Sequence, residues 1–163
     1  MLQPLRHGWA ACISAIALVV AMAACSPEQA SYSDLRPLPH DTWQHNLVID
    51  CTPVYGDSTA TYDIMFVMRH TVDLAVAQLP VTVDLIAADS TIVRRQLCIT
   101  LADQYGHWTG SGFGTLYQHR DTIATGVTPA QATHVVLWLS ADSIPGIAGI
   151  TEAGIIVTPT PRK

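Results

Sequence analysis

Apolar and polar residues alternate along short segments of the chain, which is the pattern of β-strands with one buried face. Turn-forming residues separate the segments, and no segment keeps a helical period over the length of a helix. A helical turn is expected only at residues 128–132, with Thr128 as its cap and Pro129 at its first position. The segments predicted as strands are residues 47–52, 62–70, 81–87, 92–102, 113–123, 134–139 and 154–158.

Short strands at this spacing, with no helices between them, indicate an all-β fold. We predict an antiparallel β-sandwich of the jelly-roll type, formed as a single domain by residues 41–163. Less than about a tenth of this domain is expected to be helical, against about a third in globular domains generally.

The first 24 residues are predicted to be a lipoprotein signal peptide that is not part of the fold. Arg6 precedes an uncharged run from Ala10 to Ala24, and small residues end that run, as in secretory signals. A transmembrane anchor is the alternative, but a spanning helix needs roughly 20 apolar residues and this run is shorter.

The run ends at Met22-Ala23-Ala24-Cys25, which has the form of a bacterial lipobox. The thiol of Cys25 can take a diacylglycerol, and cleavage then leaves Cys25 as an acylated N-terminus, with palmitate among the expected chains. Cys25 is therefore the predicted lipidation site. Each buried CH₂ of a lipid tail contributes about 0.8 kcal/mol to membrane binding, so several chains hold a protein firmly. Ordinary cleavage and secretion is the alternative. Residues 25–40 are polar with three prolines, and we expect them to be the lipidated N-terminus and a semi-extended tether.

The charge balance excludes nucleic acid as a partner. The chain has 8 basic residues against 13 acidic ones, and its single lysine is Lys163. A surface so poor in basic side chains neutralises few phosphates.

Two cysteines, Cys51 and Cys98, belong to the predicted fold. In its strand Cys51 shares a face with Ile49, whereas Cys98 lies on the face opposite Leu97 and Ile99. One side chain inward and one outward is poor geometry for a bridge, so two free thiols are favoured over a disulfide.

No motif of the chain predicts catalysis. The glycines of 110–114 precede a strand, whereas a phosphate loop must open a helix, so we interpret them as a bend or bulge between strands. There is no nucleophile elbow, and the histidines lack the spacing of a metal site. We therefore expect no enzyme, catalytic residue, cofactor or metal ion. The histidines after the signal are His40, His45, His70, His107, His119 and His134.

Several features along the chain carry a family resemblance. The most specific is Leu-Ala-Asp-x-x-Gly-x-Trp-x-Gly-x-Gly at residues 101–112. The others are Trp43, the strand Tyr62–His70, and a tail formed by residues 144–147 and 153–155. With the lipobox and the total length, they resemble the gliding motility lipoproteins of the GldH type.

This resemblance implies a non-enzymatic lipoprotein of the cell envelope, lipid-anchored at the outer membrane. It would be an accessory component of gliding motility and of the associated protein-secretion machinery, with other envelope proteins of that machinery as partners. A lipid-anchored module that binds glycans or proteins is the alternative, and a hydrolase is the third hypothesis. Tyr105, Trp108 and Tyr117 are the candidate partner-contact residues, because exposed aromatic side chains serve such contacts.

The loop from Asp103 to Gly114 is expected to be structural. Asp103 is placed to accept hydrogen bonds from turn amides near Gly106, as short acidic side chains do. Trp108 is expected to pack over or beside the edge of the sandwich, while His107 is given no role.

Overall fold

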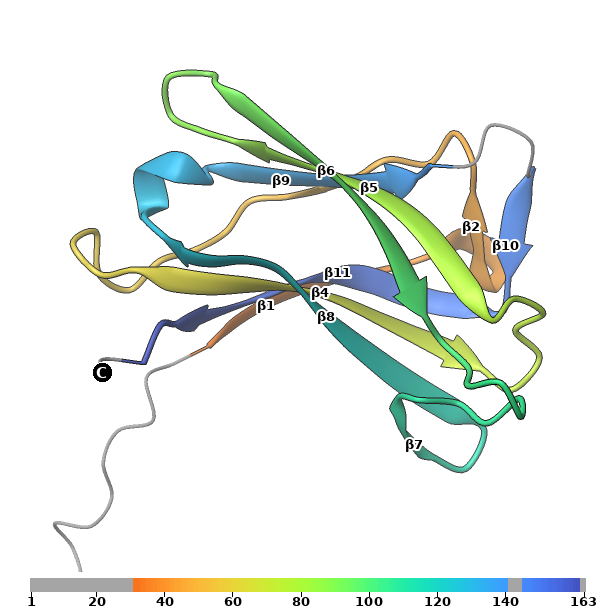
Figure 1. Ribbon diagram of the computed structural model, residues 1–163. Helices are drawn as coiled ribbons and strands as arrows, with labels where there is room; N and C mark the ends of the chain where they lie inside the picture. Colours follow the sequence, from red (N-terminus) through yellow and green to blue (C-terminus); the bar gives the residue numbers. More distant parts are fainter. Residues whose placement is uncertain (1–30, 141–144, 162–163) are drawn as a thin grey trace, which may run out of the picture. The chain divides into compact units, whose positions relative to one another are not determined.

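The computed structural model describes residues 31–140 and 145–161, and among them it contains eleven strands and two three-residue 3₁₀ turns. The all-β, antiparallel prediction is confirmed (Figure 1). The turns are η1, Pro39–Asp41, and η2, Pro129–Gln131. At η2 the backbone N–H of the predicted cap Thr128 donates to Gln131 Oε1. The strands are β1 (Tyr32–Pro37), β2 (Thr42–Gln44), β3 (Ile49–Cys51), β4 (Tyr62–Thr71), β5 (Gln78–Ile86), β6 (Ile92–Thr100), β7 (Ser111–Phe113), β8 (Leu116–Val127), β9 (His134–Leu139), β10 (Gly146–Ala148) and β11 (Ile150–Pro159).

Two sheets form the layers of the fold. Sheet 1 has the order β1-β11-β4-β8-β7, sheet 2 has the order β3-β9-β5-β6, and β10 pairs with β2 in a small ribbon. Figure 1 shows sheets 1 and 2 as two layers that cross at an angle. Their facing side chains form one buried apolar cluster, because alternate positions of each strand point inward. The cluster includes Ile64, Phe66 and Met68 of β4, Val81, Val83 and Leu85 of β5, Leu137 of β9 and Ile155 of β11.

The chain passes between the two sheets several times, and β5 and β6 are consecutive strands of sheet 2. In sheet 1, β11 lies between β1 and β4, and in sheet 2, β9 lies between β3 and β5. The last strand of each sheet is therefore inserted between two earlier ones, as in a pair of Greek keys. The jelly-roll form of the sandwich stays a prediction, with which this strand order is compatible.

The fold begins earlier than residue 41. Residues 32–37, which we expected to belong to the tether, form β1 and pair antiparallel with β11 along their whole length. Leu38 directly after them is buried in the core cluster. The prolines that indicated a tether are compatible with a strand here, because β1 is an edge strand and Pro37 is its last residue.

The predicted strand over residues 113–123 is two strands. The chain reverses at Gly114-Thr115, so that Phe113 at the end of β7 pairs with Leu116 at the start of β8. Gly114 has a φ of +66°, which is the conformation that glycine supplies at the first position of a two-residue hairpin turn. The reversal puts Phe113 and Leu116 side by side on the same face of sheet 1.

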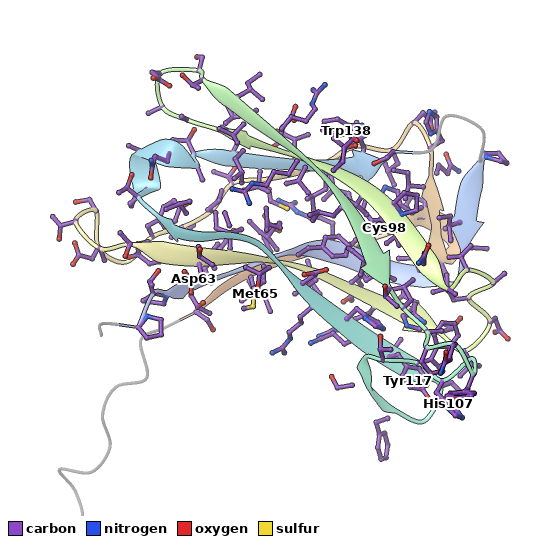
Figure 2. The ribbon with its side chains drawn as sticks, viewed as in Figure 1. Asp63, Met65, Cys98, His107, Tyr117 and Trp138 are labelled. Carbon is purple, nitrogen blue, oxygen red and sulfur yellow. The ribbon has the colours of Figure 1, made fainter. Side chains whose placement is uncertain are left out.

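The two cysteines of the fold are free, as favoured from their strand positions. Cys51 is buried, and its burial, followed by the nearby Asp34 carboxylate, raises the pKa of the thiol to about 12. Cys98 is exposed on the outer face of β6 (Figure 2). Cys25, the predicted lipidation site, lies outside the described residues.

Candidate partner-contact site at the end of the sandwich

The loop between β6 and β7 is held by a carboxylate. The Asp103 side chain accepts hydrogen bonds from the backbone N–H groups of Tyr105 (2.8 Å) and His107 (2.9 Å). Its other oxygen lies 3.2 Å from His107 Nδ1. These hydrogen bonds, first the one from the His107 amide, hold the pKa of Asp103 below its usual value. The predicted structural role of Asp103 is confirmed, and His107 has a partner that the sequence did not indicate.

Trp108 closes this end of the sandwich against an aromatic cluster. Its ring meets the buried ring of His70 edge-on, with 4.6 Å between centroids, and lies 6.1 Å from the ring of Tyr117. His70 on β4 and Tyr117 on β8 are cross-strand partners, which places their rings on the same inner face. His119, two residues further along β8, stacks on His70 at 5.6 Å. Trp108 is half-buried, so it packs beside the sandwich edge as predicted.

His70 and His119 are buried and uncharged at neutral pH. His70 Nδ1 lies 2.8 Å from the carbonyl oxygen of Thr71, which accepts, so this nitrogen carries the proton. Burial lowers the pKa of His70, and burial followed by the neighbouring His70 lowers the pKa of His119. The Nε2 atoms of both rings are buried and have no hydrogen-bond partner among the described residues. Protonating either ring therefore opposes the packing of this end.

Acid is expected to destabilise the folded protein through these two rings. Their folded-state pKa values lie below the ordinary value of about 6.5, so the unfolded chain takes up protons first as the pH falls. The free energy of unfolding is therefore unaffected by these two histidines above about pH 6.5. It decreases as the pH falls from about 6.5 through their lowered folded-state pKa values. Thermal unfolding of the full-length protein in detergent should show Tm falling by a few degrees between pH 7.5 and 5.5.

The variant His70→Phe separates this effect from general acid denaturation. It keeps a ring in the site but removes the titrating group, so its Tm should depend less on pH over this range. Tyr117→Phe is the matched control, because it changes a ring that stacks on His70 but removes no histidine, and it should keep the wild-type dependence. An unchanged pH dependence in His70→Phe would contradict the assignment.

Glycines allow the loop and β7 to lie close to β8. A Cβ at Gly110 would come within 2.5 Å of the Gln118 carbonyl oxygen, and one at Gly112 within 2.5 Å of the Tyr117 ring. A strand follows these glycines instead of a helix, in agreement with the predicted bend and against a phosphate loop.

The outer face of sheet 1 carries a groove at the same end. It has a volume of about 460 Å³, and Phe113 and Leu116 form its apolar side. Phe113 is 96% exposed, although phenylalanine is usually buried. Arg69 forms the polar side: its guanidinium donates to Gln118 Oε1 (3.1 Å) and to Glu152 Oε2 (2.8 Å). An exposed aromatic residue beside a fixed arginine is the composition of a protein-contact surface.

The three predicted contact residues lie at this end, in different settings. Trp108 and Tyr117 are half-buried and contact the histidines, whereas Tyr105 is 75% exposed in the loop and its ring lies 6.3 Å from His107. Figure 2 shows Tyr117 and His107 together beside β7. Phe113 and Leu116 were not predicted to form a surface pair, although the Gly114-Thr115 turn between them was a signal for it. A partner contact at these residues stays a prediction.

Two kinds of feature are absent from the described residues. These residues contain no group of three or more histidine, cysteine or acidic side chains arranged to hold a metal ion. No helix within residues 31–140 or 145–161 is long and apolar enough to cross a membrane.

Comparison with known proteins gives a family and a distant structural likeness. No curated protein matches the chain. The crystal structure of the infectious bursal disease virus VP2 subviral particle aligns with a TM-score of 0.32 and 16% identity, over 83% of this chain and 33% of that one, so this chain spans a third of that length. Residues 30–157 match the family described as GldH lipoprotein. The family is one of lipoproteins, which are envelope proteins held at a membrane. With most of its length matched, from just before β1 into β11, the chain belongs to the GldH lipoprotein family.

Proposed function

We propose that the protein is a non-enzymatic lipoprotein, anchored at the outer membrane through an acylated Cys25, that serves as an accessory component of gliding motility and its associated secretion machinery. The observation that carries this proposal is the family match over residues 30–157. Residues 1–24 would be removed as the signal peptide, and the segment between Cys25 and β1 would link the lipid to the sandwich.

The placement of the candidate contact site supports a role in binding envelope proteins. The chain enters the fold at Tyr32, which pairs with Val157 and through it lies beside Ile64 on β4. Leu116 pairs with Thr71 at the other end of β4, seven residues and about 23 Å further along the strand. Phe113 and Leu116, which join β7 to β8, thus lie at the end of sheet 1 away from the chain's entrance. Figure 1 shows β7 at this end. That end is available to a partner when the N-terminus is held at a membrane.

Complementation of a deletion strain with the full-length chain tests the proposal. Wild type is expected to fractionate with membranes and to restore protein secretion into the medium and, where the organism glides, colony spreading. Cys25→Ala should incorporate no labelled palmitate and should leave the membrane fraction, because the anchor contributes most of the membrane affinity. Phe113→Ser should stay in the membrane fraction and fold normally, yet restore secretion and spreading poorly.

Three results would contradict parts of this proposal. A deletion strain with normal secretion and spreading would remove the role in the machinery. Membrane retention of Cys25→Ala would remove the lipid anchor at that residue. Full restoration by Phe113→Ser would show that the partner contact lies elsewhere. The matched control for the loss of one surface side chain is Val54→Ser, because Val54 is an exposed apolar residue in the loop between β3 and β4.

A further inference from the structure

A second groove lies on the outer face of sheet 2. It shares no lining residue with the groove on sheet 1. Its volume is about 300 Å³, and its lining is mainly polar. Trp138 on β9 pairs with Thr82 on β5, which pairs with Gln96 on β6, so one row of side chains crosses three strands. Figure 2 shows Trp138 on this sheet, far from the labelled residues beside β7. The lining residues are Leu139 and the polar or aromatic residues His45, Thr82, Arg94, Gln96, Trp138 and Ser140.

An arginine is fixed in this groove. Arg94 donates from Nε to one Asp84 carboxylate oxygen (2.8 Å) and from Nη2 to the other (2.7 Å). Asp84 is buried beneath it, and the Arg94 guanidinium also lies over the Trp138 ring at 5.1 Å from the centroid. This bidentate pair and the ring contact restrict the guanidinium to one orientation. The carboxylate also neutralises its charge.

Several hydrogen-bonding groups of the groove remain available to a ligand. Arg94 uses its Nε and Nη2 atoms to bind Asp84. Its Nη1 amino group makes no hydrogen bond to any described residue. Within the described part of the chain, the Gln96 amide and the Trp138 indole N–H likewise make no side-chain hydrogen bond. The hydroxyl groups of Thr82 and Ser140 bind each other (2.7 Å), which fixes the floor between them.

From these contacts we propose that the groove binds a neutral saccharide. Adjacent hydroxyl groups of a sugar ring match planar groups with two polar atoms, such as guanidinium and carboxamide. One face of the Trp138 ring is already covered by the Arg94 guanidinium, so the indole contributes its N–H as a further donor to a sugar hydroxyl and holds the guanidinium in place. An anionic ligand gains little, because Asp84 already compensates Arg94 and no other arginine or lysine lines the groove. An apolar segment would leave the polar groups of the lining unpaired.

Binding of defined oligosaccharides to the full-length protein tests this inference. The probes are cellohexaose, chitohexaose, maltohexaose and mannohexaose, with hexagalacturonate as the anionic comparison, in a detergent without a sugar head group. By isothermal titration, at least one neutral hexasaccharide is expected to bind. Trp138→Ala should weaken it by at least about tenfold, and Gln96→Ala by about fivefold, which is the loss of about one hydrogen bond.

The control for Gln96→Ala is matched in residue type and lies outside the groove. Gln104→Ala truncates an exposed glutamine in the loop between β6 and β7 and should keep the wild-type affinity for the same sugar. If Trp138→Ala fails to fold, Trp138→Phe and Gln96→Ala decide, since Gln96 is exposed and its truncation leaves the core untouched. No binding of any neutral probe at 10 mM, binding of hexagalacturonate alone, or equal affinities of wild type and Gln96→Ala would overturn the proposal.

Discussion

Truncation of Trp43 to alanine is expected to lower the free energy of unfolding by about 3–5 kcal/mol, the usual cost for a fully buried tryptophan. Trp43 is completely inaccessible, and its ring stacks on Phe66 of β4 at 6.2 Å with 19° between the planes. Its indole N–H donates to the Leu47 carbonyl oxygen (3.1 Å), which would lose its donor. Because small domains are stable by only about 5–15 kcal/mol, this variant should be close to unfolding at 37 °C.

Urea unfolding of the full-length protein, followed by circular dichroism, measures this loss. Trp108→Ala is the matched control: its ring is half-buried, so the same truncation should cost clearly less there than at Trp43. Trp43→Phe should recover part of the stability, since it fills most of the space but lacks the N–H donor. A cost at Trp43 no greater than that at Trp108 would show that β2 is not part of the cooperative core.

Much of the fold was predictable because burial in a two-layer sandwich imposes a period of two. In the predicted strand over residues 81–87, alternation places Val81, Val83 and Leu85 on one face, and all three are buried. The strand predicted over residues 62–70 is β4, which lies at the centre of sheet 1. The same period of two predicted that the Cys51 side chain points inward and the Cys98 side chain outward, and Cys51 is buried while Cys98 is exposed. These features depend on neighbours within one strand, which the sequence displays directly.

What was missed depends on which strands are neighbours. Arg95 lies on the inward-facing side of β6, which is an edge strand of sheet 2. Its guanidinium extends to sheet 1 and donates to the Ile123 carbonyl oxygen of β8 (2.8 Å). An inward-pointing charge on an edge strand opposes pairing with a strand of another molecule, and no local sequence pattern predicts it. The groove of Trp138 likewise needs the register of three strands. Nothing in the sequence near Trp138 points to Arg94 or Gln96 as its companions.

Replacement of Gly154 by alanine is expected to detach β1 from the sandwich. Gly154 on β11 is buried and pairs with Leu35 of β1. A Cβ at this position would overlap the Asp34 carbonyl oxygen and lie 2.9 Å from the Leu35 Cα, both backbone atoms that no side-chain rotation can move. Strand β1 must therefore shift away, which disrupts its pairing with β11 and exposes Leu38. The expected cost is about 3 kcal/mol or more, at the upper end of the range for single substitutions.

Hydrogen exchange followed by mass spectrometry locates this effect. In wild type the amides of residues 32–37 that pair with β11 should be protected, and in Gly154→Ala they should exchange much faster while those of β5 and β9 change little. Gly56→Ala is the control, because a Cβ there meets no atom within 4 Å. Unchanged protection of residues 32–37 in Gly154→Ala would mean that β1 adds little to the sandwich. The predicted boundary at residue 41 would then describe the stable unit better than the observed start of β1 does, and the link from Cys25 to that unit would be correspondingly longer.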